Sequence, residues 1–375
     1  MKESHCYWAE LLQQFVNKPP CVRVCSTSVN YFYSMFRFHE NTKIGIESCV
    51  FQNFISNWID ITNPLVIEVD NSIVRANMMS GMTVLISEVF DIQAFWRVIS
   101  VIGSNFNSNK MNGIEIYTDE FDDQNLAIIC QKSNFLTNDQ IGLFIGKMAI
   151  NELEIIDWKA CTNGSRGCKL NIVHHRANKN SFKISNSKFS ENKDTGLQID
   201  DCGVNISNTH CNNNKKYGLS INGTFRPSNV PVEINEFIMN WPMDTTLNKV
   251  SCINNQIHGL SIKSYWKGGI SITNWAMNKN SEDGILLYNP AGKTGRVEAS
   301  NKSEINLKRV AKKLPATPSN PSRDMIIDQG HSISNEERVL PGFWMINSTK
   351  ILRNRKCGLT SKNTYVDIGN VTITG

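Results

Sequence analysis

One phrase, an Asn followed by three variable residues and then a Gly, recurs nine times along this chain. Successive glycines are 22 to 32 residues apart, except for two longer gaps of 41 and 74 residues. Repetition at this period is typical of solenoids, in which each repeat is one structural unit stacked on the next. The members are Asn77, Asn109, Asn138, Asn163, Asn192, Asn214, Asn255, Asn280 and Asn354, paired with Gly81, Gly113, Gly142, Gly167, Gly196, Gly218, Gly259, Gly284 and Gly358.

Apolar residues flank the phrase with a spacing of two. In "NKDTGLQI" and "NKKYGLSI", aliphatic residues stand one and three positions after the Gly. Further apolar columns lie seven, twelve and fourteen positions before the Gly, so each repeat holds about three short strands. Strands this short bury a face only when they pair with their copies in neighbouring coils. We therefore predict an all-β fold, a right-handed parallel β-helix with about ten or more coils.

The Asn and the Gly have separate expected roles in that fold. Asn tolerates a left-handed backbone at a turn, and we predict that each Asn hydrogen-bonds the Asn of the next coil, which forms a structural ladder. We predict that each Gly is a structural turn residue at a place where a side chain would collide with the neighbouring coil.

The remaining segments set the expected domain boundaries. Residues 1–37 form a cap segment whose apolar residues, Tyr7, Trp8, Leu11 and Phe15 among them, have the spacing of a short amphipathic helix. Residues 38–375 form the β-helix. Residues 222–248 and 289–341 break the repeat and contain prolines, which predicts loop insertions.

Composition narrows the environment. The 375 residues carry a net charge of +5, too small to indicate a nucleic-acid partner. No apolar run of 18 residues predicts a membrane span, and the first residues do not read as a signal peptide. The 11 cysteines show neither paired metal-site spacing nor an even count, so free thiols are expected. We predict a cytoplasmic, intracellular protein with no cofactor and no metal.

The phrases "NKDTGLQI", "NKKYGLSI" and "NQIHGLSI" resemble the parallel β-helix repeat of the pectin-lyase-like superfamily, over roughly residues 38 to 375. The resemblance implies two functions. Secreted members are mostly polysaccharide lyases, hydrolases and epimerases. Intracellular members include the β-helix regions of the F-box-only ubiquitin-ligase adaptors and of the Shc SH2-domain-binding protein, where the solenoid is an interaction surface.

Two short elements of the sequence offer candidate catalytic residues. Asp200 and Asp201 resemble the Asp-Asp element of pectic hydrolases, and His258 with Gly259 resembles their His-Gly element. Paired carboxylates serve glycoside hydrolysis because one donates a proton while the other activates water. Asp200 and Asp201 are more simply a solvated turn after a strand, and His258 more simply a turn residue.

The outward column two positions after each Gly contains one carboxylate, Glu115, and is otherwise mostly polar or small. It therefore reads as a solvated strand face without an acidic cluster. We predict a non-catalytic interaction scaffold or substrate-recognition module, with a protein or peptide as partner and a link to ubiquitin-ligase adaptors by family resemblance. The alternative is a polysaccharide-processing enzyme of the same fold, with a glycan as partner.

Overall fold

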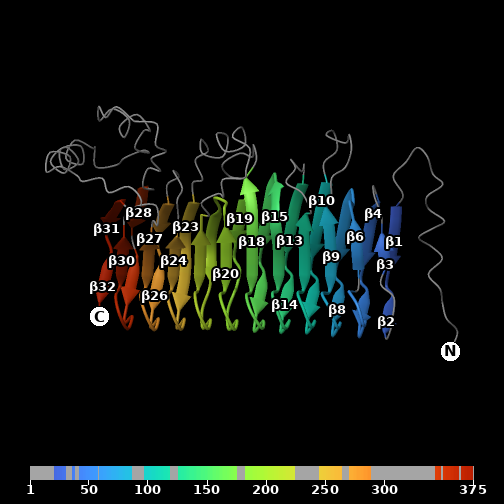
Figure 1. Ribbon diagram of the computed structural model, residues 1–375, viewed down its shortest axis with the longest axis horizontal. Helices are drawn as coiled ribbons and strands as arrows, with labels where there is room; N and C mark the ends of the chain where they lie inside the picture. Colours follow the sequence, from blue (N-terminus) through green and yellow to red (C-terminus); the bar gives the residue numbers. More distant parts are fainter. Residues whose placement is uncertain are drawn as a thin grey trace, which may run out of the picture.

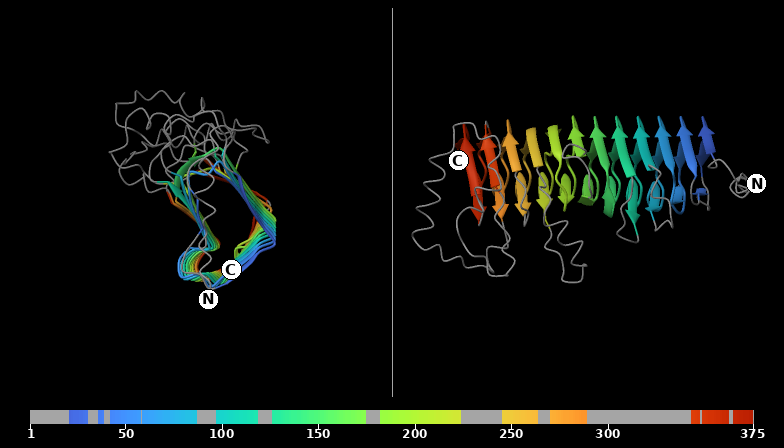
Figure 2. Two further views of the ribbon diagram at one scale, coloured as in Figure 1. Left: turned by 90° about the vertical axis from the view of Figure 1, so that its right-hand side faces the viewer. Right: turned by 90° about the horizontal axis from the view of Figure 1, so that it is seen from above.

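Short strands stack coil upon coil into one long solenoid, with β1 and β32 near opposite ends (Figure 1). The computed structural model describes residues 21–30, 36–38, 42–57, 59–86, 97–118, 126–174, 182–223, 245–263, 270–288, 343–347, 349–362 and 365–374. Every pairing between the described strands is parallel, and each of these strands pairs with its copies in the neighbouring coils. Seen along its axis, the solenoid wall bends at corners that superimpose from coil to coil (Figure 2).

Three sheets run along the solenoid. The first contains β1 (Cys21–Cys25), β4 (Lys43–Glu47), β7 (Val66–Asp70), β10 (Arg97–Ile102), β13 (Leu126–Gln131), β16 (Glu152–Ile156), β19 (Phe182–Ser185), β21 (Asn205–His210), β23 (Thr245–Ile253), β25 (Ile270–Thr273), β28 (Phe343–Asn347) and β31 (Tyr365–Gly369). The second contains β2 (Ser28–Asn30), β5 (Val50–Gln52), β8 (Ile73–Arg75), β11 (Asn105–Asn107), β14 (Asn134–Leu136) and β17 (Lys159–Cys161).

The third sheet, which follows the Asn-x-x-x-Gly turn, has eleven strands: β3 (Phe36–Phe38), β6 (Ile59–Thr62), β9 (Met82–Ile86), β12 (Ile114–Thr118), β15 (Leu143–Ile150), β18 (Cys168–His174), β20 (Leu197–Asp200), β22 (Leu219–Asn222), β24 (Leu260–Lys263), β27 (Ile285–Tyr288) and β30 (Leu359–Lys362). The long strand β23 joins the first sheet to three further strands: β26 (Ala276–Asn278), β29 (Lys350–Leu352) and β32 (Thr372–Thr374). The prediction of an all-β parallel β-helix of about ten or more coils is confirmed.

The described residues test the predicted domain boundaries only in part. Strand β1 already pairs with β4, so the solenoid includes residues ahead of position 38. The predicted capping helix lies outside the described residues, and the described residues contain no α-helix. Most of the expected insertions 222–248 and 289–341 also lie outside the described residues, although β23 occupies the end of the first.

Asn side chains form a buried hydrogen-bonded column at the turn into the third sheet. Asn192 Nδ2 donates to Asn214 Oδ1 at 3.1 Å, and Asn214 Nδ2 donates to Asn255 Oδ1 at 3.1 Å. The same contact joins every consecutive pair from Asn77 to Asn354. The left-handed backbone, however, belongs to the residue before each Asn, for example Glu191 at φ 63°. Each Asn Oδ1 from Asn109 to Asn354 also accepts a hydrogen bond from the backbone N–H of the Asn in the preceding coil, while the residue before each Asn makes the bend.

The repeated glycines stand where the neighbouring coil leaves no room for a side chain. A Cβ added at Gly218 would lie 2.7 Å from the carbonyl oxygen of Gly259 and 2.7 Å from that of Cys211. None of the nine has a positive φ, so space, not backbone conformation, excludes a side chain there.

Aromatic rings fill part of the interior as a stack. Phe106 and Phe135 lie parallel with centroids 5.1 Å apart, and Trp158 meets Phe135 edge-on at 4.5 Å. Trp158 stands in the column where neighbouring coils carry Ser, while Ala160 occupies the Phe column of the same coil. A large residue thus compensates a small one, so the buried volume is conserved.

Candidate functional site

Four consecutive strands of the third sheet present polar side chains at their first two outward positions. In β20, Leu197 and Ile199 point into the core, which turns Gln198 and Asp200 outward. The same alternation applies in β18, β22 and β24, and parallel register aligns the outward residues in two columns. We call these eight residues the polar block: Lys169, Asn171, Gln198, Asp200, Ser220, Asn222, Ser261 and Lys263.

Large apolar side chains bound the first column of the polar block at both ends. Phe144 precedes Lys169 in its column, and Leu286 follows Ser261. The Lys169 ammonium lies 5.4 Å from the Phe144 ring centroid, a cation–π contact. The first column of the block therefore has defined limits along the solenoid.

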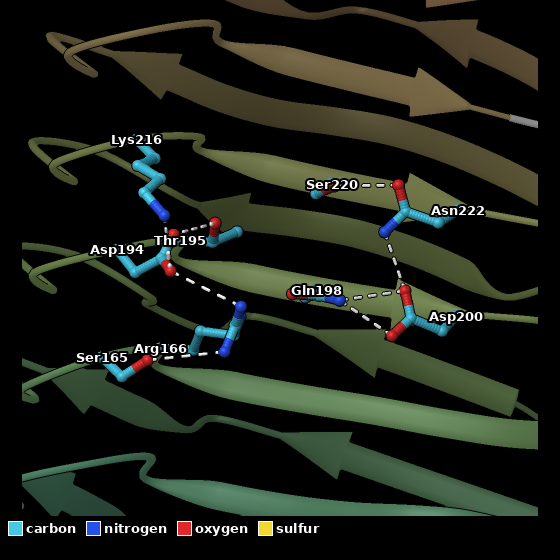
Figure 3. Close-up of polar contacts among 9 residues, drawn as sticks. All are labelled: Ser165, Arg166, Asp194, Thr195, Gln198, Asp200, Lys216, Ser220 and Asn222. Atoms are coloured by element: carbon cyan, nitrogen blue, oxygen red, sulfur yellow. Dashed lines mark hydrogen bonds and ion pairs between the residues drawn. The ribbon is translucent and has the colours of Figure 1, made fainter.

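The Asp200 carboxylate is the centre of the block. Gln198 Nε2 donates to both Asp200 oxygens, at 3.0 and 2.8 Å, and Asn222 Nδ2 donates to Oδ1 at 2.7 Å (Figure 3). The Ser220 hydroxyl donates in turn to Asn222 Oδ1 at 3.4 Å. Asp200 is only 8% exposed although it points away from the core. Such a carboxylate is held in one orientation by neutral donors.

Two polar oxygens of the block have no hydrogen-bond partner. Ser261 is 1% exposed and its hydroxyl is unpaired, as is the buried Oδ1 of Asn171. In the first column, the short side chains of Ser220 and Ser261 stand between the longer Gln198 and Leu286. Buried unpaired polar atoms are costly, so such atoms on an outward face point to a missing hydrogen-bonding partner.

A second polar cluster lies at the adjoining turn. Asp194 Oδ2 lies 3.1 Å from Lys216 Nζ and 3.5 Å from Arg166 Nη2, each from a neighbouring coil (Figure 3). The Thr195 hydroxyl donates to Asp194 Oδ1 at 3.0 Å. This turn cluster thus combines one carboxylate with two cations, a net positive charge beside the polar block.

His258 lies in the same turn column but two coils further on. The ring is buried, and its Nδ1 accepts a hydrogen bond from the Asp283 backbone N–H at 3.2 Å. Nε2 lies 3.6 Å from Glu282 Oε2, and Tyr217 stacks on the ring. Burial lowers the pKa of His258, against the opposite influence of the Asp283 and Glu282 carboxylates. The neutral ring therefore carries its proton on Nε2, facing Glu282.

The structure does not bring the three sequence candidates into one site. Asp200 and His258 are two coils apart, roughly 10 Å along the axis, and Asp200 is the last residue of β20 whereas His258 lies in the turn before β24. Asp201 directly follows β20 with φ 65°, and its backbone N–H donates to the Asn222 carbonyl. It ends the strand, and Asp200 alone of the three belongs to the polar block.

Sequence reasoning missed most of this arrangement. The turn residues Arg166, Asp194 and Lys216 stand among the three variable positions between Asn and Gly, where no pattern marks them out. A usable signal lies instead in the column four positions after the Gly. Aligned across coils, that column is a run of amide, carboxylate, amide and ammonium at Asn171, Asp200, Asn222 and Lys263.

The described ranges also show how the possible metal ligands and the thiols are distributed. Across them, no group of three or more His, Cys, Asp or Glu side chains is placed to hold a metal ion. Nor does this part of the chain include a helix with the length and hydropathy to span a bilayer. All ten cysteines within it are free thiols, and seven are buried. Burial raises the pKa of Cys130 to about 12, so this thiol is unreactive.

Comparisons with known proteins give only a distant structural likeness. No protein-family model and no curated protein matches the chain. The chain is similar to the crystal structure of the periplasmic alginate epimerase AlgG, with 12% identity, a TM-score of 0.46, and coverage of 95% of this chain and 78% of that one. Single- and double-mutant forms of AlgG match at 11% identity, with TM-scores of 0.45 and 0.47 and the same coverage. At this level the likeness concerns the fold alone.

The prediction of a cytoplasmic location is wrong on this comparison, because the similar solved protein is periplasmic. Free cysteines are also a poor guide to the compartment, for a physical reason. Seven of the ten described thiols are buried in the core, where they pack as small apolar groups. Buried thiols are shielded from oxidation in any compartment, so their free state does not report where the protein resides.

Proposed function

We propose that the polar block binds a linear polysaccharide, the ligand class of the alternative prediction. One observation carries the proposal: eight adjoining outward positions over four coils are polar, and they include a carboxylate, three amides and two hydroxyls. Sugar hydroxyls both donate and accept hydrogen bonds, and amide and hydroxyl side chains match both needs. A ligand with repeating units also suits a surface that repeats coil by coil.

The same geometry favours a binding function of the polar block over a hydrolytic one. Asp194 and Asp200 are six positions apart in one coil, roughly 15–20 Å at the rise of an extended chain. Glycosidase carboxylates stand about 5–10 Å apart. His258 uses Nδ1 as an acceptor for the Asp283 backbone, so that nitrogen is not available as a base. The polar block thus supports recognition of a glycan chain, with any processing chemistry requiring further groups.

The test measures binding and turnover on the same polymers. Affinity electrophoresis in gels containing soluble polysaccharides should retard the protein, and Gln198→Ala with Asn222→Ala should abolish the retardation. Lys110→Ala is the control, because its exposed ion pair with Asp139 lies outside the polar block. Chromatography of the recovered polymers reports any cleavage or epimerisation. Migration unaffected by every polymer would refute the proposal.

A second candidate function, the interaction scaffold suggested by the F-box-only and Shc-binding resemblance, is favoured by a separate surface. Ile55 and Met78 occupy the same turn position in successive coils and are 51% and 57% exposed. Met79 is 39% exposed beside them. Exposed methionines are frequent at adaptable protein-binding surfaces. Capture experiments with Met78→Lys and Met79→Lys would test it, because loss of a captured protein only in these variants supports a scaffold.

A further inference from the structure

We infer that the polar block selects a neutral, hydroxyl-rich polysaccharide over an acidic one, and that Asp200 is the residue that sets this specificity. The inference rests on the proposed function, since it names the ligand class of the same site. It follows from the hydrogen-bonding capacity that the block leaves unused.

Around Asp200, the polar atoms that still lack a hydrogen-bond partner are mainly acceptors. The carboxylate receives three hydrogen bonds, two from Gln198 and one from Asn222, and an ionised carboxylate has about four acceptor positions. In the adjacent coil Asn171 Oδ1, in register with Asp200, has no partner. The ligand group at this place must therefore be a donor: a sugar hydroxyl is one, whereas the ionised carboxylate group of a uronate unit is not.

Ser261 provides the second, independent observation. Its hydroxyl points outward from β24, is 1% exposed and lacks a partner. It stands in the first column beside Ser220, two coils from Gln198. A hydroxyl group accepts and donates equally well, so this position completes a path of neutral hydrogen-bonding groups across the block.

Charge separates the two ligand classes. Within the block the one carboxylate is central, while the cations Lys169 and Lys263 lie at its two ends. A uronate unit bound over Asp200 would place two like charges within a few ångströms in a site of low exposure, where repulsion is weakly screened. A neutral sugar meets no such penalty. The position over Asp200 therefore rejects an acidic unit, although Lys169, Lys263 and the neighbouring turn cluster carry positive charge.

The experiment compares matched polymers with three proteins. Binding of neutral polymers such as xylan or soluble glucans and of acidic polymers such as polygalacturonate or alginate is measured for the wild type, Asp200→Asn and Asp139→Asn. We expect the wild type to prefer neutral polymers by about tenfold or more, the usual effect of one charge-assisted hydrogen bond on affinity. Asp200→Asn should reduce that preference by about tenfold, because it removes the charge and keeps the shape. Asp139→Asn makes the same charge change outside the block and should leave the preference unaltered.

Ser261→Ala separates a binding role of this hydroxyl from a purely structural one. Removal of a buried hydroxyl without a partner should leave the melting temperature unchanged or higher, yet weaken binding of neutral polymers. Failure of every polymer to bind overturns the proposed function itself. Binding that is equal for both classes, or unchanged in preference by Asp200→Asn at an unaltered melting temperature, overturns the specificity inference and leaves the binding proposal standing.

Discussion

The Asn214 Oδ1 atom accepts two hydrogen bonds from Asn192, one from its side-chain amide at 3.1 Å and one from its backbone N–H at 3.0 Å. Both residues are fully buried, so water cannot replace either hydrogen bond. The Asn column therefore satisfies backbone groups as well as side chains.

Asn214→Ala should lower the free energy of unfolding by about 1–3 kcal/mol or more, because it leaves the Asn192 N–H buried and unpaired. Lys215→Ala, an exposed change in the same turn, is the control and should have little effect. Urea denaturation measures both. Equal midpoints for the two variants would contradict a stabilising role for the column.

Gly218→Ala should destabilise the protein by about 1–3 kcal/mol or prevent folding, because the new methyl group meets two carbonyl oxygens at 2.7 Å. Gly45→Ala is its matched control, since a Cβ there lies 3.6 Å from the nearest atom, Arg23 Cγ. Thermal melts followed by circular dichroism compare the pair. If Gly218→Ala melts like Gly45→Ala, the close approach of the coils is not as described.

Stability should fall as the pH drops below about 6.5, the ordinary value for histidine. Because the pKa of His258 is lowered in the folded state, the unfolded chain binds more protons between the two pKa values. Stability is therefore complete above the unfolded pKa and decreases as the pH falls through the folded one. His258→Gln should flatten this part of the curve, because it removes the group whose pKa is lowered. Urea midpoints from pH 8 to pH 5 provide the check, and parallel curves for the wild type and His258→Gln would oppose it.

Trp158→Phe should change the free energy of unfolding by no more than about 1 kcal/mol. The smaller ring leaves some space, but the substitution also removes an indole N–H that is buried without a partner. Trp158→Ala should cost about 3–5 kcal/mol, because it opens a cavity between Phe135 and Phe189. Denaturant titration of both variants tests the difference, and similar losses in both would argue against the unpaired N–H.

Thiol labelling should divide the described cysteines into two groups. Cys21, Cys25 and Cys357 are exposed and should react with a maleimide within minutes. Cys130 and Cys168 are buried with raised pKa values, so they should react only after denaturation. Peptide mapping by mass spectrometry identifies the modified residues. Rapid labelling of Cys130 in the native protein would show that the core opens.

The fold was predictable from the sequence because every coil of a parallel β-helix repeats the same pattern of buried, turn and outward residues. Each strand pairs with a copy of itself, so one aligned column, such as the aliphatic residues at Leu197, Leu219 and Leu260, reports register, face and neighbour at once. The Asn and Gly positions follow from the same alignment. One local detail escaped it: which residue of the turn is left-handed depends on the cap geometry, and it is the residue before the Asn.

The candidate site required the tertiary structure. Asp194 and Lys216 are 22 residues apart, and only the stacking of their coils puts them 3.1 Å from each other. The low exposure of Asp200 and Ser261 is likewise invisible in a pattern of alternating residues, which assigns both to a solvated face. Sequence periodicity determines which side of a strand a residue occupies. Whether that side is covered, and which distant residues pair across it, depends on coil lengths and packing that no single repeat encodes.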